Sequence, residues 1–288
     1  MSDPAAGLSG SLVAIISPFR DGDLDLDAYA ELVEWHIASG TSGIVVAGTT
    51  GEAATLHPEE RETLSRRAVE IAAGRCHVMV GTGTNCTRTS VEITRAATKW
   101  GVDSVLVVTP YYNKPPQEGL VQHYRAVAEA ADDLPVVAYD VPGRTGITIR
   151  EDTVKRLAEI DNIVALKDAT LDLERAERLA RDTDLAILSG DDAATLAMMK
   201  TGAMGVVSVA ANVVPAAMAK LCFDLDADVH EQLGPLFKAL FVQSNPIPTK
   251  WALAEMGRIR DELRLPLVPL APSHRASVRS ALERAGAL

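Results

Sequence analysis

The chain has 288 residues, of which 47% are hydrophobic and only 4% aromatic, and its formal net charge is −11. A chain of this length can bury a substantial core in one large α/β domain or in two smaller ones. The acidic balance argues against a nucleic-acid or anionic-membrane partner, because either partner requires a basic face. No apolar run approaches the ~20 residues of a membrane span, and the N-terminus lacks the basic–apolar pattern of a signal peptide.

The cysteines and histidines show neither a disulfide framework nor a metal site. The three cysteines, Cys76, Cys86 and Cys222, have no CxxC spacing, and such an odd, sparse set favours a reducing cytoplasm. The six histidines are scattered, without HExxH or paired-ligand spacing. We therefore expect a cytoplasmic protein without a metal ion.

Apolar runs and helical patterns alternate along the first 210 residues. The segments predicted as strands are 12–16, 44–47, 77–80, 104–108, 135–139, 163–167, 185–188 and 206–209. The segments predicted as helices are 27–38, 58–73, 89–100, 118–131, 151–159, 173–181 and 192–199. Asp27 and Pro58 mark helix starts, and Gly40, Gly74, Gly101 and Gly202 mark helix ends.

Eight strands without polar alternation, separated by helices, predict a parallel sheet closed on itself, a (β/α)8 TIM barrel. A doubly wound open sheet is the alternative, but no GxGxxG motif opens the first crossover. We assign residues 1–210 to the barrel, as the catalytic domain. Residues 211–288 show helical patterns interrupted by prolines, and we predict a three-helix extension packed on the barrel.

One apolar run, 163–167, ends on a lysine, Lys167. Burying an unpaired ammonium group is costly, and desolvation lowers a lysine pKa so that the neutral amine can form a Schiff base with a ketone. The alternative is a lysine that extends along apolar surface and keeps its ammonium group in water. Of the eight lysines only Lys167 ends an apolar strand run, which singles it out.

In a parallel barrel, catalytic groups gather where the strands end. The loop 48–51 follows the second strand and offers free N–H groups with two hydroxyls, Thr49 and Thr50, which suit a carboxylate or a phosphate. Tyr139 ends the fifth strand, and Arg144 follows it in a loop stiffened by proline. A guanidinium group binds a carboxylate through two parallel hydrogen bonds. Hydroxyls, one lysine and one arginine are thus expected on one rim of the barrel.

Each of these residues has a purely structural alternative. The loop 48–51 can be a tight turn that caps the next helix, Tyr139 a core tyrosine with one hydrogen bond, and Arg144 half of a surface salt bridge. Their joint placement with Lys167 at the ends of several strands favours a catalytic site.

Six segments carry a resemblance to a known family. The sequence resembles the 4-hydroxy-tetrahydrodipicolinate synthase (dihydrodipicolinate synthase) family, in the N-acetylneuraminate lyase superfamily of class I aldolases, from about residue 10 to residue 288. The segments are GTTGEAATL (48–56), TPYYNKPPQEGL (109–120), YDVPGRTG (139–146), KDAT (167–170), SGDDA (189–193) and NPIPTKWAL (245–253). Three positions depart from the enterobacterial pattern, with Asp140 for Asn, Gly143 for Ser and Asp168 for Glu.

The resemblance implies catalytic roles at matching positions. Lys167 matches the lysine that forms a Schiff base with pyruvate, and Tyr139 matches the tyrosine that donates and accepts protons. Thr49 and Tyr112 match the rest of a hydroxyl relay, in which Tyr112 reaches in from a neighbouring subunit. The resemblance therefore also implies a homo-oligomer, expected as a tetramer built from two dimers, and no cofactor.

Four further positions match substrate-binding positions of the family. Thr50 and the backbone of Val207 match positions that bind pyruvate, and Arg144 matches the arginine that meets the carboxylate of L-aspartate 4-semialdehyde. Gly190 falls where a backbone carbonyl lines the pocket. The implied reaction is the condensation of pyruvate with this semialdehyde, in lysine and diaminopimelate biosynthesis.

Two other functions stay open at this point. One is a different pyruvate-dependent lyase of the superfamily, acting on sialate or a 2-keto-3-deoxy sugar acid, and the other is a non-catalytic sensor of keto acids. Inhibition by L-lysine is expected to be weak or absent. The histidine positions of the family's effector cleft carry Pro58 and Arg61, and its glutamate position carries Thr89, although Asn85 and Tyr111 are retained.

Overall fold

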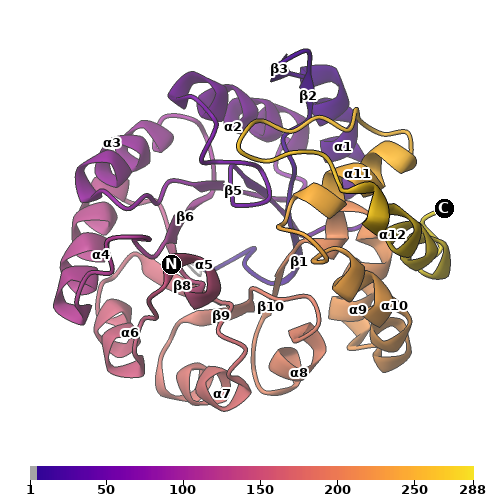
Figure 1. The fold of residues 1–288 in the computed structure, drawn as a ribbon. Helices are drawn as coiled ribbons and strands as arrows, with labels where there is room; N and C mark the ends of the chain where they lie inside the picture. The colour runs from indigo at the N-terminus through magenta and orange to yellow at the C-terminus, as the bar shows by residue number, and fades with distance from the viewer. Residues whose placement is uncertain (1–4) are drawn as a thin grey trace.

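The computed structural model describes residues 5–288, and within this range eight parallel strands close into a barrel (Figure 1). These strands are β1 (Gly10–Ala14), β4 (Gly43–Val46), β5 (His77–Gly81), β6 (Ser104–Val108), β7 (Val136–Asp140), β8 (Ile163–Asp168), β9 (Ala186–Ser189) and β10 (Gly205–Ser208). β1 pairs with both β10 and β4, which closes the sheet. The predicted barrel is confirmed, and every predicted strand boundary lies within about two residues of the observed one.

The strands lack polar alternation because both of their faces are buried. Leu12, Val45 and Leu188 belong to a cluster that alternate residues of the strands build in the interior of the barrel. Neighbouring residues such as Val13 and Ile44 belong to the larger core between the barrel and the surrounding helices. Fully burying an aliphatic side chain stabilises the fold by roughly 1.5–3 kcal/mol. Both layers therefore contribute to closing the barrel.

The outer layer consists of helices that follow the strands around the barrel (Figure 1). They are α1 (Leu26–Ala38), α2 (Pro58–Ala72), α3 (Thr87–Ala97), α4 (Gln117–Ala131), α6 (Glu151–Ala158), α7 (Leu173–Asp182), α8 (Thr195–Lys200) and α9 (Pro215–Asp224), with the short α5 (Pro142–Thr145) after β7 and the 3-10 turn η1 (Ala210–Asn212) after β10. Pro58 takes the first position of α2 as predicted. The four glycines predicted to end helices all have positive φ, the region that a side chain disfavours.

Two predicted helix starts need correction. Asp25, not Asp27, caps α1, because its carboxylate accepts a hydrogen bond from the backbone N–H of Ala28. The helix predicted from residue 192 begins at Thr195, because the Asp192 side chain is buried and hydrogen-bonded to the end of β10. Local propensity alone does not reveal either partner.

The segment after β10 forms four helices, α9, α10 (Ala227–Ala239), α11 (Ile247–Glu255) and α12 (Pro272–Arg284). α9 packs against β1 and so fills the eighth place in the helical layer, whereas α10 and α11 both pack against α12. Residues 211–288 therefore contain four helices where three were predicted, and α10–α12 lie beyond the helical layer of the barrel. The division near residue 210 stays a proposal, and the packing of α9 favours placing it after that helix.

A two-residue turn, Asp21–Gly22, joins β2 (Phe19–Arg20) to β3 (Asp23–Leu24) in an antiparallel hairpin. Both turn residues have positive φ, as expected for an Asp-Gly hairpin turn. This hairpin carries no signal in the strand pattern, because two-residue strands have no periodicity.

The joint between the first and last barrel strands is reinforced by a side chain. Asn212 donates a hydrogen bond from Nδ2 to the carbonyl of Ala14 at 2.8 Å, and its Oδ1 accepts one from the N–H of Ile16 at 3.1 Å. Asn212 is 1% exposed and therefore acts as a buried connector across the closing joint. Across residues 5–288, none of the helices combines the length and the apolar character needed to span a membrane.

Candidate active site

Two adjacent strands bring Tyr139 and Lys167 together. β7 and β8 pair in parallel, and Tyr139 lies directly opposite Lys167 in the register. Both side chains point into the barrel, each residue is 6% exposed, and Lys167 Nζ lies 4.1 Å from the centroid of the Tyr139 ring. Lys167 therefore does not extend to solvent, which was the alternative that the sequence left open.

The barrel interior favours the neutral form of Lys167. The pKa of Lys167 is lowered to about 7, mainly by burial. The carboxylate of Asp192 opposes this shift, and the charge of Arg144 contributes to it. A sizeable fraction of the amine is thus neutral near pH 7. A neutral amine is the form that attacks a carbonyl carbon.

Asp192 is a neighbour of this lysine that was not predicted from the sequence. Its carboxylate accepts a hydrogen bond from Ser208 Oγ at 2.6 Å and from the N–H groups of Val209 and Ala210 at 3.2 and 2.8 Å. Burial raises the pKa of Asp192 to about 6 in spite of these donors. The only signal in the sequence was the pair of aspartates that follows the seventh barrel strand.

Tyr139 has a hydroxyl partner at the end of β4. Burial raises the pKa of Tyr139, whereas the charge of Arg144 and a hydrogen bond with Thr49 act in the opposite direction. The phenol therefore stays protonated at neutral pH and can both donate and accept a proton. Thr49 and Tyr139 thus lie next to each other within one chain, and their part in a hydroxyl relay stays a prediction.

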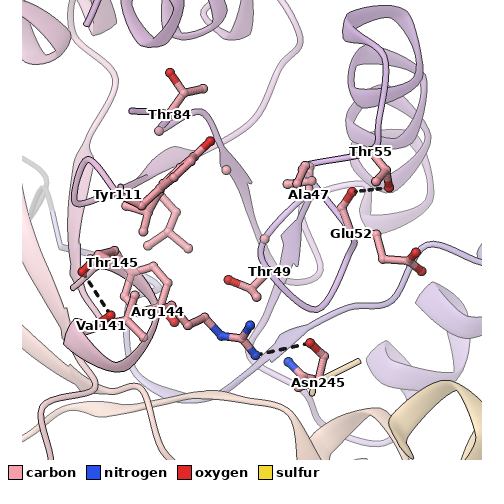
Figure 2. Close-up of a pocket in the computed structure, with 18 of the residues that line it drawn as sticks. Ala47, Thr49, Glu52, Thr55, Thr84, Tyr111, Val141, Arg144, Thr145 and Asn245 are labelled. Carbon is pink, nitrogen blue, oxygen red and sulfur yellow. Dashed lines mark hydrogen bonds between the residues drawn. The ribbon is translucent and has the colours of Figure 1, made fainter. Parts of the chain in front are cut away.

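The C-terminal extension supplies a residue that connects the two predicted substrate-binding groups. Asn245 Nδ2 donates a hydrogen bond to Thr50 Oγ1 at 2.9 Å. The backbone carbonyl of Asn245 accepts one from Arg144 Nη2 at 3.3 Å (Figure 2). The segment that contains Asn245 entered the sequence analysis only as a family motif. Its position at the site depends on a contact across 195 residues, which no local pattern reveals.

A cavity of about 350 Å³ opens beside these groups. Thr49, Tyr139 and Arg144 line it, together with Tyr111 and Asn245 (Figure 2). Lys167 is not part of this lining, but its Nζ lies against the ring of Tyr139, which is. The cavity is large enough for a small organic substrate.

Two predicted backbone positions lie near the ends of β9 and β10. Gly190 donates its N–H to the carbonyl of Asp168 at 2.7 Å, and an added Cβ would come within 2.7 Å of the Ala169 side chain. Only glycine fits this approach. Val207 is buried in the interior cluster opposite Leu12. Both positions therefore lie on the barrel strands or loops that surround Lys167.

The structure separates the two adjacent tyrosines of the loop after β6. Tyr111 lines the cavity, whereas Tyr112 is 89% exposed, and its backbone has a φ of 72°. Left-handed backbone is unfavourable for a bulky side chain. Tyr112 therefore does not join the other relay residues within this chain.

Arg61, expected at the effector cleft, is buried and also lines the cavity. Its guanidinium donates to the backbone carbonyls of Gly81 and Ala53, and burial lowers its pKa. The expectation of weak or absent inhibition by L-lysine stays a prediction. Within residues 5–288, no group of three or more His, Cys, Asp or Glu side chains is arranged to hold a metal ion.

Comparison with known proteins identifies the family. The profile of the Dihydrodipicolinate synthetase family matches residues 7–285. The chain belongs to this family. The family resemblance drawn from the six sequence segments is thereby confirmed.

Individual members of the family are similar over nearly their whole length. The 4-hydroxy-tetrahydrodipicolinate synthase of Nitrosospira multiformis is 49% identical, covering 97% of this chain and 96% of the relative. A crystal structure of the dihydrodipicolinate synthase of Acinetobacter baumannii in complex with pyruvate has 46% identity and a TM-score of 0.95, covering 97% of this chain and 99% of that one. A solved monomeric variant of dihydrodipicolinate synthase has 43% identity and a TM-score of 0.95, covering 99% of both chains.

Proposed function

We propose that this protein condenses pyruvate with L-aspartate 4-semialdehyde to give 4-hydroxy-tetrahydrodipicolinate, in lysine and diaminopimelate biosynthesis. The observation that carries this proposal is the buried Lys167, which lies opposite Tyr139 and has a lowered pKa. The family to which the chain belongs supports it. Relatives named for this reaction are 46–49% identical over almost the whole chain, which supports the choice of substrates.

The first half of the reaction captures pyruvate. Its carboxylate binds the hydroxyls and N–H groups of the Thr49–Thr50 loop, with backbone groups at Gly190 and Val207 completing the pocket. Neutral Lys167 attacks the ketone carbon, and loss of one water gives an imine. Tyr139 and Thr49 carry the protons of this step. Loss of a proton from C3 then gives an enamine, because the protonated imine accepts the electron pair.

The second half joins the two substrates. Arg144 binds the carboxylate of the semialdehyde, and the enamine carbon attacks the aldehyde to form a carbon–carbon bond. The amine of the second substrate then displaces Lys167 from the imine carbon, which closes the ring and returns the free lysine. One water is released overall, and no electrons leave the substrates, so the chemistry is complete without a cofactor.

Trapping of the imine tests the role of Lys167. Incubation with pyruvate and borohydride should leave a stable N-carboxyethyl group on Lys167 and abolish activity. Lys250 provides an internal control, because it is also buried and its pKa is lowered to about 8. The rate of trapping should rise with pH through about 7 as Lys167 loses its proton. An adduct on Lys250, or no adduct, would contradict the assignment.

Turnover with different second substrates tests the reaction itself. Pyruvate with L-aspartate 4-semialdehyde should be consumed, whereas sialate and 2-keto-3-deoxy sugar acids should not be cleaved. Cleavage of a sugar acid together with trapping at Lys167 would assign the protein to another lyase of the superfamily. Trapping without turnover of any substrate would indicate a keto-acid sensor.

An assembled site is part of the proposal, because the relay is incomplete in one chain. Tyr112 is 89% exposed and projects away from its own cavity, which supports a role in the site of a neighbouring subunit. A dimer is the smallest assembly that meets this need, and a tetramer of two dimers stays the expectation. A cytoplasmic location also stays part of the proposal.

A further inference from the structure

The residues that follow Tyr139 and Lys167 lie on the opposite face of the same strands. Asp140 and Asp168 pair directly in the register, one position beyond the Tyr139–Lys167 pair. Since successive side chains of a strand alternate in direction, these two carboxylates point out of the barrel toward the helices. Asp140 is 0% exposed and Asp168 is 2% exposed. Two buried carboxylates therefore lie immediately behind the predicted catalytic pair.

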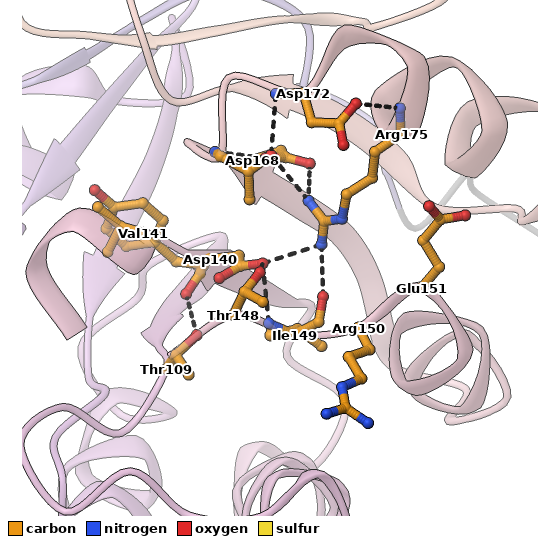
Figure 3. A network of polar contacts seen from close by, with 12 residues as sticks. Thr109, Asp140, Val141, Thr148, Ile149, Arg150, Glu151, Asp168, Asp172 and Arg175 are labelled. Carbon is orange, nitrogen blue, oxygen red and sulfur yellow. Dashed lines mark hydrogen bonds and ion pairs between the residues drawn. The ribbon is translucent and has the colours of Figure 1, made fainter. Parts of the chain in front are cut away.

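One arginine of α7 binds both carboxylates. Arg175 Nη1 donates to Asp168 Oδ2, and Arg175 Nη2 donates to Asp140 Oδ2 at 3.0 Å and to the Ile149 carbonyl at 2.8 Å (Figure 3). Arg175 is itself 6% exposed. A guanidinium fork can hold two oxygens in fixed directions, which a single ammonium group cannot do. Arg175 thus connects the ends of β7 and β8 from the outside of the barrel.

The pairing of these two strands needs such a connection. The register shifts between Val136 and Val137, and only the four pairs from Val137 to Asp140 continue to the strand ends. A slip by one residue would turn every side chain to the other face. Tyr139 and Lys167 would then no longer meet inside the barrel. Arg175 binds the last pair of the register, Asp140 and Asp168, directly after Tyr139 and Lys167.

We infer that Arg175 is a positioning residue, which holds Asp140 and Asp168 at the outer face and thereby keeps Tyr139 and Lys167 opposite each other at the inner face. This inference rests on the proposed function, because it presumes that Lys167 forms the imine. Arg175 touches neither substrate nor reacting atoms, and its effect passes through the strand register.

The two carboxylates use their oxygens differently. Both oxygens of Asp168 are occupied, since Oδ1 accepts from the N–H and hydroxyl of Thr170 at 2.8 and 2.7 Å and Oδ2 accepts from Arg175. Asp140 uses only Oδ2, which accepts from Thr148 Oγ1, Ile149 N–H and Arg175, while its buried Oδ1 has no partner. An asparagine at 140 can place its NH2 group at the free side, but at 168 it must direct its NH2 group at a donor.

This difference gives a test with two isosteric substitutions, Asp140→Asn and Asp168→Asn, and a third, Arg175→Lys, that removes the guanidinium fork. Asp168→Asn and Arg175→Lys should slow imine formation by about 10²-fold, the order expected for a misplaced reacting group. Asp140→Asn should slow it by less than ~10-fold, because the hydrogen bonds persist without the added strength of the charge. The KM for pyruvate should stay within about threefold of the wild-type value in all variants, because the Thr49–Thr50 loop follows β4 and not β7 or β8. Rapid-quench trapping with borohydride measures the rate constant.

Arg178→Lys is the matched control. Arg178 lies on the same helix and pairs with Glu151 at 2.7 Å and with Glu174, its side chain is 40% exposed, and both of its ion-pair partners lie on helices. This variant should form the imine at the wild-type rate. Equal rates for Arg175→Lys and Arg178→Lys would overturn the inference, and so would equal losses in Asp140→Asn and Asp168→Asn. Losses that merely match the unfolded fraction, measured by near-UV circular dichroism, would overturn it as well.

A pH profile keeps the inference testable even if Asp168→Asn and Arg175→Lys fail to fold. Burial raises the pKa of Asp140 to about 6, against the opposing charge of Arg175 from α7, and Asp168 from β8 raises it further. Tyr124 of α4 also faces Asp140. Below about pH 6 the protonated Asp140 is neutral, as is asparagine, so wild type and Asp140→Asn should form the imine at the same rate.

Above about pH 6 the wild-type rate should exceed that of Asp140→Asn, because the ionised Asp140 carboxylate then forms a charged pair with Arg175. A ratio of the two rates that does not change with pH would overturn the inference. If the wild-type protein traps no pyruvate at Lys167, the proposed function itself is wrong. That result differs from the outcomes above, because it removes the reaction that Arg175 is inferred to serve.

Discussion

At the scale of single residues, Lys167 shows how the chemistry of the site opposes the stability of the fold. Its amine lies in the barrel interior, where burial brings its pKa to about 7. The unfolded chain keeps the ordinary lysine pKa and so binds more protons between pH 7 and 10.5. The free energy of unfolding therefore rises with pH across this window, and the penalty of burying Lys167 is complete below it.

Replacing Lys167 by methionine should stabilise the protein while abolishing imine formation. The difference between pKa values of 10.5 and about 7 corresponds to at most about 5 kcal/mol. We expect a gain in the free energy of unfolding of roughly 2–4 kcal/mol at pH 6. The gain is smaller than the upper bound because the variant also loses the attraction of the ammonium group to the Tyr139 ring and to the Asp192 carboxylate. Urea unfolding at pH 6 and pH 10 measures this gain, which should shrink at the higher pH. A variant less stable than wild type at pH 6 would contradict the argument.

The sequence located some of the site residues and missed others for a physical reason. Lys167, Tyr139 and Thr49 stand at the ends of apolar runs, where a barrel exposes its chemistry, so their placement followed from the strand pattern. Arg175 and Asn245 act through hydrogen bonds to other elements. Such pairings depend on packing that no local window contains.

At the scale of elements, the C-terminal extension supports the loop that carries Thr49 and Thr50. Glu52, at the end of this loop, accepts a hydrogen bond from Lys250 Nζ of α11 and one from the Arg264 N–H at 3.1 Å. Lys250 and Glu52 are both buried, and Lys250 Nζ also lies 4.0 Å from the centroid of the Phe19 ring. The extension thus contributes a buried ion pair and is more than a cover for the barrel.

Breaking this pair on one side should destabilise the fold strongly. Lys250→Met leaves the Glu52 carboxylate buried without its cation, and losses of ~3–5 kcal/mol are typical of such changes. The same variant should raise the KM for pyruvate, because the Thr49–Thr50 loop loses its support. Thermal unfolding and steady-state kinetics measure the two effects. The double variant Glu52→Gln with Lys250→Met should recover part of the stability. A single variant as stable as wild type would show that the pair makes no net contribution.

The elements themselves were largely predictable, with exceptions that share a cause. The barrel strands are buried on both faces, so each appeared as a continuous apolar run. The β2–β3 hairpin escaped prediction because its strands are two residues long, although Asp21–Gly22 is a strong turn signal. The start of α8 shifted because Asp192 is used in a tertiary contact.

At the scale of the whole molecule, the single chain leaves Tyr112, which is predicted to be a relay residue, outside its own cavity. Tyr112 is 89% exposed on a left-handed backbone, and Tyr111 next to it turns into the cavity. Adjacent residues of an extended segment point in opposite directions, so two neighbouring tyrosines do not share one pocket, and the placement of Tyr111 and Tyr112 agrees with this. Which surfaces join the subunits stays beyond any pattern in the sequence, because scattered exposed apolar residues are normal on soluble proteins.

Mixing two inactive variants should restore activity if Tyr112 serves a neighbouring site. In a mixed dimer of Lys167→Met and Tyr112→Phe chains, one site receives an intact lysine and an intact tyrosine. Random reassembly of equal amounts should therefore recover about a quarter of the wild-type activity. The measurement is turnover after mixing under conditions that exchange subunits, with each variant alone as the control. No recovery despite exchange, verified by native mass spectrometry, would place Tyr112 outside the partner's site.

The joint between β1 and β10 also governs the order in which the protein forms during its synthesis. β1 emerges from the ribosome first, but one of its two partners, Gly205–Ser208, is nearly 200 residues away. The growing chain therefore carries an unpaired strand edge throughout most of translation, a state that favours association with other chains. Only when Asn212 appears can its side chain bond Ala14 and Ile16. We therefore expect the nascent chain to be most prone to association before β10 is synthesised, and less so once the barrel closes.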